Sequence, residues 1–495
     1  MEWPRASGIL VHPTSFPGQF GIGDLGLGAV RVFDFLSAAR QKLWQILPLG
    51  PTGYGDSPYA LLSAFAGNPL LISPEHLIEA GLLTADDLVS LPTFPTDHVD
   101  FASVIPAKLA LLRTSFAYFE ASSCQSMRKR FDAFLAEQHE WLDDYALFMA
   151  LKAAHNQVAW TKWPTKYRQR DPEALAEART TLAREVVFHQ YCQFLFFAQW
   201  EVVRQAAHER GISIVGDLAI FVAHDSADVW AHPDYFHLDD AGLPVVVAGV
   251  PPDYFSVTGQ RWGNPIYRWD RLAETGYAWW IARVRQALKM MDIIRLDHFR
   301  GFEACWQIPG TAKTAVTGHW VKGPGISLFH AIHKALGEVP FIAEDLGVIT
   351  PEVRDLQHAL GFPGMHILQF AFGSDANNPD LPHNYSRDSV VYTGTHDNNT
   401  TRGWFETQPS ETQGHILRYL KSTPNTVVQA MIRAALSSVA NLVILPLQDV
   451  LELESEARMN FPSHADGNWQ WRCTDDQLAS KCAEELADLA HLFGR

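Results

Sequence analysis

Short apolar runs that end in polar residues recur along the whole chain. Each run has the length of a strand that is buried on both faces, as in a parallel sheet. Eight such runs occur, at residues 8–12, 43–49, 212–218, 293–298, 341–347, 365–370, 390–397 and 442–449. We predict one β-strand at each of them.

Between several of these runs, apolar residues recur every three or four positions, which predicts amphipathic helices. The helical segments are residues 29–40, 186–210, 279–291, 352–360 and 426–440. Strands that alternate with helices indicate parallel β/α units, and eight units favour a closed (β/α)8 TIM barrel. We expect one α/β barrel to span residues 1–495, with a doubly wound open sheet as the main alternative.

Two connections are too long for simple loops between a strand and a helix. The first, residues 51–181, contains helical periodicity, for example at Leu112, Phe116 and Phe119, and we expect a largely helical inserted subdomain. The second, residues 221–275, is rich in Pro, Gly, Asp and aromatic residues. We expect an ordered but irregular inserted loop subdomain, which in a barrel would cover the active site at the strand C-termini.

Net charge and cysteine content indicate which binding partners and which cellular location to expect. The net charge of -16 disfavours nucleic acid and anionic membranes as partners. No apolar run approaches the ~20 residues of a membrane-spanning helix, and the N-terminus shows no secretory signal. The five cysteines are scattered and form no Cys-x-x-Cys pair. We therefore expect a cytoplasmic protein without a structural zinc.

Two motifs suggest a cofactor or a metal, and neither has the required context. Residues 21–26 have the glycine spacing of a dinucleotide site, but Pro13 and Pro17 separate them from the preceding predicted strand, and no suitable acid follows. A tight loop entering a helix is the better interpretation. Three His/Asp neighbour pairs could serve a metallohydrolase, but adjacent residues on a strand point to opposite faces. We expect no metal and no cofactor.

Acidic residues stand at or near the ends of four predicted strands. Asp297, Glu344 and Asp397 lie at or near the ends of three of them, and Asp217 lies at the end of a fourth. Core packing does not require carboxylates that converge at a barrel mouth, whereas glycosidic bond chemistry uses one as a nucleophile and one as a proton donor. Arg295 lies two residues before Asp297 and on the same side of the strand, so it would keep that carboxylate ionised. A purely structural ion pair is the alternative for this segment.

The high aromatic content fits a sugar ligand, because aromatic faces flanked by hydrogen-bonding groups suit a neutral, amphipathic molecule. The chain has 16 Trp and 29 Phe.

Several motifs, in order along essentially the whole chain, resemble those of glycoside hydrolase family 77, the 4-α-glucanotransferases (amylomaltases, or disproportionating enzymes) of the α-amylase clan. They lie at residues 5–18, 21–26, 54–59, 216–218, 251–265, 294–301, 342–347, 394–398 and 467–469. Two positions depart from the family pattern: Ala219 replaces a frequent proline, and Asn399 replaces a common aspartate.

The resemblance implies that Asp297 is the nucleophile, Glu344 the general acid/base, and Asp397 the third carboxylate. It further implies a set of substrate-binding residues: Arg295, His298, His396, Tyr59, Ser57, Asp217, Gln260, Trp262 and Asn468. The implied reaction is retaining transfer of glucanosyl units between α-1,4-glucans, with maltooligosaccharides, amylose, glycogen or starch-derived chains as substrates.

Two alternatives remain open at this stage, an α-amylase-like hydrolase and a non-catalytic glucan-binding barrel. Transfer requires that water be kept from the intermediate, and the loop 251–265, with Tyr254, Phe255 and Trp262, is the candidate for that shielding.

Overall fold

All eight predicted strands are present in the computed structural model, which describes residues 3–252, 256–462, 464, 466–478 and 480–495. The strands are β1 (Ala6–Leu10), β2 (Leu43–Gln45), β3 (Ser213–Ala219), β6 (Ile293–Asp297), β9 (Phe341–Ala343), β10 (Gly364–Ile367), β11 (Ser389–Tyr392) and β12 (Leu442–Pro446). Most end several residues before the predicted limit, because the polar residues that close each run belong to the loops at the barrel mouth.

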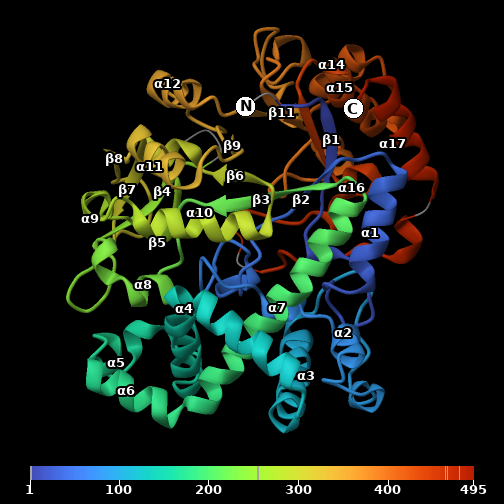
Figure 1. Cartoon of the computed structure of the whole chain (residues 1–495). Helices are drawn as coiled ribbons and strands as arrows, with labels where there is room; N and C mark the ends of the chain where they lie inside the picture. Colours follow the sequence, from blue (N-terminus) through green and yellow to red (C-terminus); the bar gives the residue numbers. More distant parts are fainter. Residues whose placement is uncertain (1–2, 253–255, 463, 465, 479) are drawn as a thin grey trace.

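The eight strands form one parallel sheet in the order β10-β11-β12-β1-β2-β3-β6-β9, so neighbours in space are neighbours in chain order. The two ends of this sheet meet, since the N–H of Ala343 on β9 donates to the carbonyl of Pro363, next to β10, at 2.9 Å. The sheet is therefore a closed barrel (Figure 1). A doubly wound sheet would reverse its strand order at a switch point, so that alternative is wrong.

The five predicted helices are also present and surround the barrel (Figure 1). They are α1 (Leu27–Ala38), α7 (Ala183–Glu209), α10 (Ala278–Met290), α12 (Pro351–Leu360) and α15 (Val427–Ser437). Trp44 of β2 illustrates how the strands pack against the helices. The centroid of its buried ring lies 4.9 Å from that of Phe33 on α1 and 5.8 Å from that of Trp200 on α7. Such aromatic contacts add to the burial energy of the shell.

Further helices follow the later strands and were not predicted. They are α11 (Ile326–Leu336), α13 (Thr401–Thr407), α14 (Ser410–Leu420), α16 (Leu447–Val450) and α17 (Ser480–Leu492). The connection from β10 to β11, all of which is described, contains only 3-10 turns. The barrel thus lacks a regular helix at this one connection.

The segment 51–181 is dominated by helices that lie beside the barrel (Figure 1). They are α2 (Pro74–Glu79), α3 (Phe101–Ala121), α4 (Gln125–Ala154), α5 (Thr165–Arg168) and α6 (Pro172–Thr181). Phe116 and Phe119 of α3 are buried, and both pack on Tyr191 of α7. The division of this segment as a separate subdomain stays a prediction.

The segment 221–275 is more regular than its composition suggested. It contains α8 (Ala227–Ala231), α9 (Trp269–Glu274) and the strands β4 (Val246–Val250) and β5 (Gln260–Pro265). In an antiparallel sheet, β4 pairs with β5 and with β7 (Ala304–Pro309), and β7 pairs with β8 (His319–Lys322). The expectation of an irregular loop was therefore wrong for β4 and β5. Their sheet is completed by β7 and β8, which belong to a different connection, after β6. Tyr254 and Phe255 lie outside the described residues.

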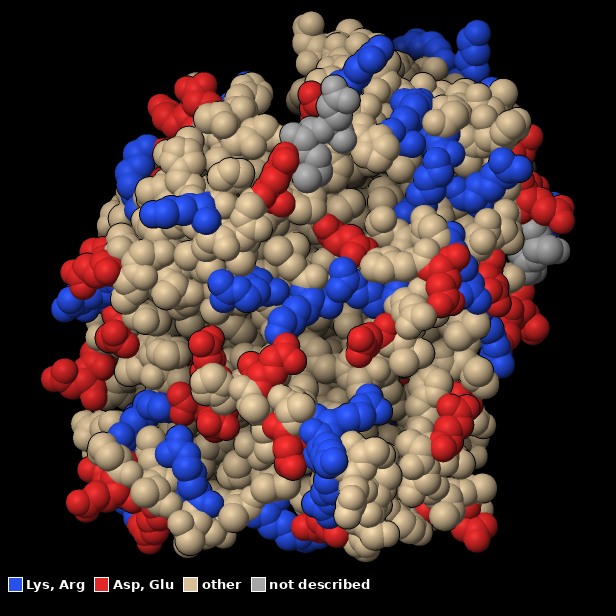
Figure 2. Space-filling model, viewed as in Figure 1, with Lys and Arg blue, Asp and Glu red and all other residues tan. Residues whose placement is uncertain are grey.

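Figure 2 shows basic and acidic side chains interspersed over the face seen in Figure 1, with acidic residues on both sides of a central basic band. Within the described residues, no helix is both long and apolar enough to cross a membrane.

The glycine-rich run 21–26 is tied to the inserted helices by a buried ion pair. Lys108 of α3 donates to Asp24 Oδ2 at 3.2 Å and to the carbonyl of Ile72 at 2.7 Å, and both charged side chains are buried. The other oxygen of Asp24 accepts from the N–H of Gly26, just before α1. The run is a tight loop entering a helix, as predicted.

Lys108→Met should destabilise the protein, because it removes the cation that is hydrogen-bonded to the buried Asp24 carboxylate. We expect a loss of about 3–5 kcal/mol in the free energy of unfolding, measured by urea denaturation. Adding Asp24→Asn should restore part of that loss. Equal stability of Lys108→Met and the parent would contradict this account of the pair.

Candidate active site

A buried arginine joins two carboxylates at the C-terminal ends of β3 and β6. The strand register pairs Asp217 with Arg295, and Asp297 follows two residues later on the same face. Nη1 of Arg295 donates to both oxygens of Asp217, at 2.8 and 2.6 Å, and to Oδ1 of Asp297 at 3.1 Å. The side chains of Asp217 and Arg295 are 0% and 4% exposed, whereas that of Asp297 is 28% exposed. Only Asp297 of the two carboxylates therefore opens to solvent.

Tyr59 connects the segment 51–181 to this ion pair. Its hydroxyl donates to Asp217 Oδ2 at 2.7 Å, and burial together with the Asp217 charge raises the pKa of the phenol well above its usual value. Its ring stacks on His396 with centroids 5.2 Å apart, and Trp469 lies 6.0 Å from it. The turn before it is closed by Ser57, whose Oγ accepts from the N–H of Tyr59.

Glu344 follows β9 and is held by backbone donors from two strands. Its Oε2 accepts from the N–H of His298 at 2.7 Å, and its Oε1 accepts from the N–H of Leu346 at 2.9 Å. His298 has a φ of 52°, in the left-handed region that disfavours residues other than glycine. This strained conformation at the end of β6 accompanies the contact between its N–H and Glu344.

Asp297 and Glu344 compete for a proton. Burial raises the pKa of each, and Arg295 opposes the shift at both. At Asp297, the charges of the neighbouring carboxylates add to the rise and bring the pKa to about 8. Two carboxylates in such an environment do not both ionise near neutral pH, so the pair retains a proton. The expectation that Arg295 by itself keeps Asp297 ionised is therefore wrong, because burial and the neighbouring acids outweigh it. One group with a charge and one with a proton is the arrangement that acid-assisted nucleophilic chemistry needs.

The imidazole of His298 offers a free ring nitrogen to the site. His298 Nε2 is buried and has no hydrogen-bond partner among the described residues. Burial lowers the pKa of this histidine to about 3, so the ring is neutral. The ring lies edge-on to Trp262, with centroids 4.8 Å apart, and Trp262 Nε1 donates to Gln260 Oε1 at 3.1 Å. These three side chains place aromatic rings beside hydrogen-bonding groups, which suits a polar, ring-shaped ligand.

Asp397 lies on the loop that follows β11 and has a half-exposed side chain. Its Oδ1 accepts from Asn460 Nδ2 at 2.6 Å, and its carbonyl accepts from Arg458 Nη2 at 2.6 Å. Its charge contributes to the raised pKa of Asp297, so the two groups interact electrostatically. Asn460 and Arg458 were missed, although their position after the last barrel strand places them at the mouth.

One predicted substrate-binding residue and the two departures from the family pattern make contacts within the surrounding loops. Asn468 accepts from the N–H of Phe461 at 2.7 Å and donates to the carbonyl of His464 at 2.9 Å, so here its amide holds the loop around it. Its contact with a sugar stays a prediction. Of the departures from the family pattern, Ala219 accepts a hydrogen bond through its carbonyl from Arg283, and Asn399 Nδ2 donates to a serine hydroxyl.

Among the residues that the structure describes, no three His, Cys, Asp or Glu side chains are arranged to hold a metal ion.

A sequence profile of glycoside hydrolase family 77, described as 4-alpha-glucanotransferase, matches residues 11–478. The chain belongs to this family. The 4-alpha-glucanotransferase of Thermus thermophilus is 50% identical over all of both chains, and that of Synechocystis is 51% identical over 99% of this chain and 98% of its own. The chain is accordingly a transferase, a 4-α-glucanotransferase that disproportionates glucans.

The structures agree with this assignment. The amylomaltase from Streptococcus agalactiae, solved in complex with acarbose, is 38% identical and superposes with a TM-score of 0.96 over 99% of both chains. The amylomaltase from Corynebacterium glutamicum shares the fold, with a TM-score of 0.79 at 20% identity over 98% of this chain and 75% of its own.

The acid pair of this glucanotransferase should make its stability depend on pH. Both pKa values are raised in the folded protein, so it binds more protons than the unfolded chain between about pH 4 and pH 8 and loses stability as pH rises across that window. Asp297→Asn removes one member of the pair. We expect its melting temperature to exceed that of the parent by about 1–3 °C at pH 8 and the difference to shrink towards pH 4, as measured by calorimetry.

Asp240→Asn, at an exposed acidic residue, is the matched control and should show no such trend. A stability change in Asp297→Asn that is the same at pH 5 and pH 8 would contradict the origin of the effect.

Proposed function

We propose that the transfer reaction is a retaining double displacement in which Asp297 is the nucleophile and Glu344 the general acid/base. The observation that supports this most is the acid pair itself: Asp297 is open to solvent and hydrogen-bonded to Arg295, and burial raises the pKa of both Asp297 and Glu344. In the first step, a carboxylate oxygen of Asp297 bonds to the anomeric carbon of the donor glucan. The glycosidic bond breaks, and the proton of Glu344 moves to the departing oxygen.

In the second step, Glu344 takes the proton from the 4-hydroxyl of an acceptor glucan. The acceptor oxygen bonds to the anomeric carbon, and the bond to Asp297 breaks, so the α configuration is restored. Retention requires the two carboxyl groups to lie about 5–5.5 Å apart when substrate is bound. The raised pKa values of both groups support this assignment, since each residue must alternate between charged and neutral forms during one turnover.

The remaining residues form the sugar-binding site around the reacting bond. Asp397 is the third carboxylate and stabilises the transition state, and His298 supplies its free ring nitrogen. Arg295, His396, Tyr59 and Asp217 surround the same subsite, and the neighbouring glucose units contact Ser57, Gln260, Trp262 and Asn468. Support for this set comes from the contacts that join most of it: Tyr59 to Asp217 and His396, and His298 to Trp262.

The substrates that we propose are maltooligosaccharides, amylose, and glycogen or starch-derived α-1,4-glucans. The acarbose complex of the Streptococcus agalactiae relative supports an oligosaccharide-binding site in this fold. All five cysteines are free thiols, which supports a reducing, cytoplasmic location.

Acceptor glucan reaches the intermediate before water does because the described part of the loop around Trp262, residues 256–265, shields the site. Trp262 contributes to this shield, since its indole is 39% exposed and contacts His298. A Trp262→Ala variant should therefore release more free reducing sugar for each transfer event.

Incubation with maltotriose distinguishes the candidate functions. The transferase should produce glucose together with a ladder of longer maltooligosaccharides, as resolved by anion-exchange chromatography. A hydrolase would yield shorter sugars only, and a binding protein would leave maltotriose unchanged. Asp297→Asn and Glu344→Gln should each lower kcat by at least about a thousandfold, because each removes a group that acts in both steps.

Two results would contradict this proposal. Full activity of Asp297→Asn would exclude it as the nucleophile. Loss of the parent's activity in a chelator, with recovery on addition of a divalent metal, would instead favour a metal-dependent reaction. Trp262→Ala with the parent's ratio of transfer to hydrolysis would overturn the shielding role of that residue alone.

A further inference from the structure

Asp449 is a buried carboxylate whose partners are all neutral groups. It lies on α16, directly after β12, and is 1% exposed. Oδ1 accepts from the N–H of Thr401 at 2.7 Å, and Oδ2 accepts from the hydroxyls of Thr401 and Thr393, at 2.7 and 2.5 Å. Burying a carboxylate is costly unless such donors replace water, and an apolar residue would fill the same space without that cost.

The two threonines flank the loop that carries a proposed catalytic carboxylate. Thr393 follows β11 and Thr401 begins α13, so residues 394–400 form the loop between them, with His396 and Asp397 in its middle. Asp449 therefore ties both ends of this loop to a third point, the end of the neighbouring strand β12. The loop ends are fixed to each other through a single carboxylate.

Further contacts hold the loop between these ends. Asn398 Oδ1 accepts from the N–H and the hydroxyl of Thr395, both at 2.9 Å. From the β10 side, Gln369 Nε2 donates to the carbonyl of Asn399 at 2.9 Å. With the ends tied by Asp449, these contacts leave the loop few alternative conformations.

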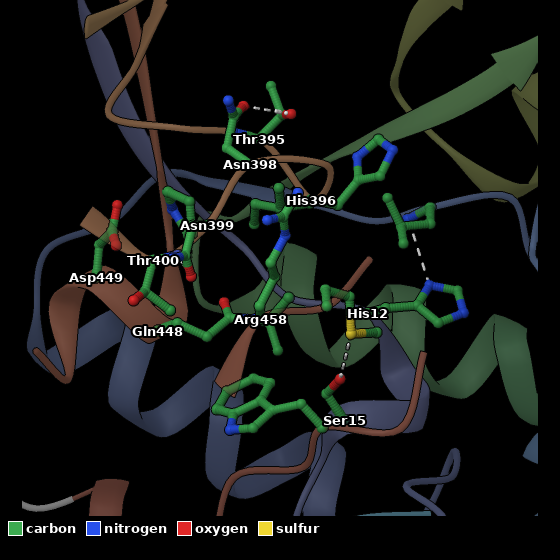
Figure 3. A pocket seen from close by; sticks show the side chains of 16 residues that line it. His12, Ser15, Thr395, His396, Asn398, Asn399, Thr400, Gln448, Asp449 and Arg458 are labelled. Atoms are coloured by element: carbon green, nitrogen blue, oxygen red, sulfur yellow. Dashed lines mark hydrogen bonds between the residues drawn. The ribbon is translucent and has the colours of Figure 1, made fainter. Parts of the chain in front are cut away.

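Figure 3 shows a small cavity that borders the loop, with Asp449 at one end and His12 and His396 at the other. Its volume of about 30 Å³ admits only one or two water molecules. Arg458 reaches across this cavity, and its guanidinium binds the carbonyl of Asp397. The loop is thus held at its ends by Asp449 and at Asp397 by Arg458.

We infer that Asp449 is a positioning residue for the transfer reaction: through Thr393 and Thr401 it fixes the loop that presents Asp397 and His396 to the sugar. This inference rests on the proposed role of Asp397. A displacement of about 1 Å in a group that acts on the transition state can cost about a hundredfold in rate, whereas substrate binding through the other subsites is retained. We call the contacts of Asp449 with Thr393 and Thr401 the clamp. Loss of the clamp should therefore lower mainly kcat.

The test compares two substitutions at Asp449 in the full chain. Asp449→Ala removes all three contacts, and we expect kcat for maltotriose disproportionation to fall at least tenfold with KM within threefold of the parent. Asp449→Asn keeps the contacts in neutral form, because its oxygen can accept from the Thr401 N–H while its amino group donates to the threonine hydroxyls. We expect this conservative variant to recover kcat to within threefold of the parent. Thr393→Val, which removes one contact at nearly constant volume, should give an intermediate kcat.

Ile416→Ala on α14 is the control for general destabilisation, since Ile416 is fully buried outside the site. It should lower the melting temperature but leave kcat unchanged well below that temperature. The clamp is overturned if Asp449→Ala keeps the parent kcat, if Asp449→Asn loses as much activity as Asp449→Ala, or if Ile416→Ala loses as much kcat for the same loss of stability.

Asp397→Asn, measured in parallel, separates the clamp from the mechanism on which it rests. If Asp397→Asn is inactive and Asp449→Ala is fully active, the clamp alone fails. If Asp397→Asn is fully active, the role of Asp397 fails and the clamp's function fails with it.

Discussion

A guanidinium buried in the barrel requires negative charge beside it, and the site is built around that requirement. Arg295 is almost completely buried, and Asp217 on the adjacent strand neutralises it with two short hydrogen bonds. Because Asp217 already satisfies the cation, the third contact to Asp297 is longer and leaves that carboxylate open to solvent. The parallel register of β3 and β6 places all three groups on one face, so the ion pair follows directly from strand pairing.

The site stores unfavourable interactions that the rest of the fold must offset. His298 adopts a left-handed conformation, two carboxyl groups with raised pKa values lie near each other, and Asp449 is buried without a cation. Each is costly for folding and useful for chemistry, as is usual where pKa values are tuned. The compensation comes from extensive apolar burial around the barrel, such as the contacts of Trp44 with α1 and α7.

The parts of the site that could be predicted from the sequence are those set by local pattern. An apolar run ending in an acid marks a buried strand with its tip at the barrel mouth, which located Asp217, Asp297 and Glu344. Contacts between distant segments carry no such local signal. Asn460 reaches Asp397 across 63 positions, and β4 finds its partner β7 in another connection, so neither could be predicted from its neighbours in the chain. The tie from Asp449 to Thr393 is of the same kind.

The central claim is that Asp297 forms a covalent bond to the sugar, while Glu344 acts as the general acid in the first step and the general base in the second. Reaction of Glu344→Gln with α-maltosyl fluoride tests this most directly, because fluoride leaves without a proton while the second step still needs the missing base. Peptide mass spectrometry of the quenched protein should find one maltosyl unit on the peptide that contains Asp297. Absence of an adduct while fluoride is released, or an adduct on any other residue, would contradict the account.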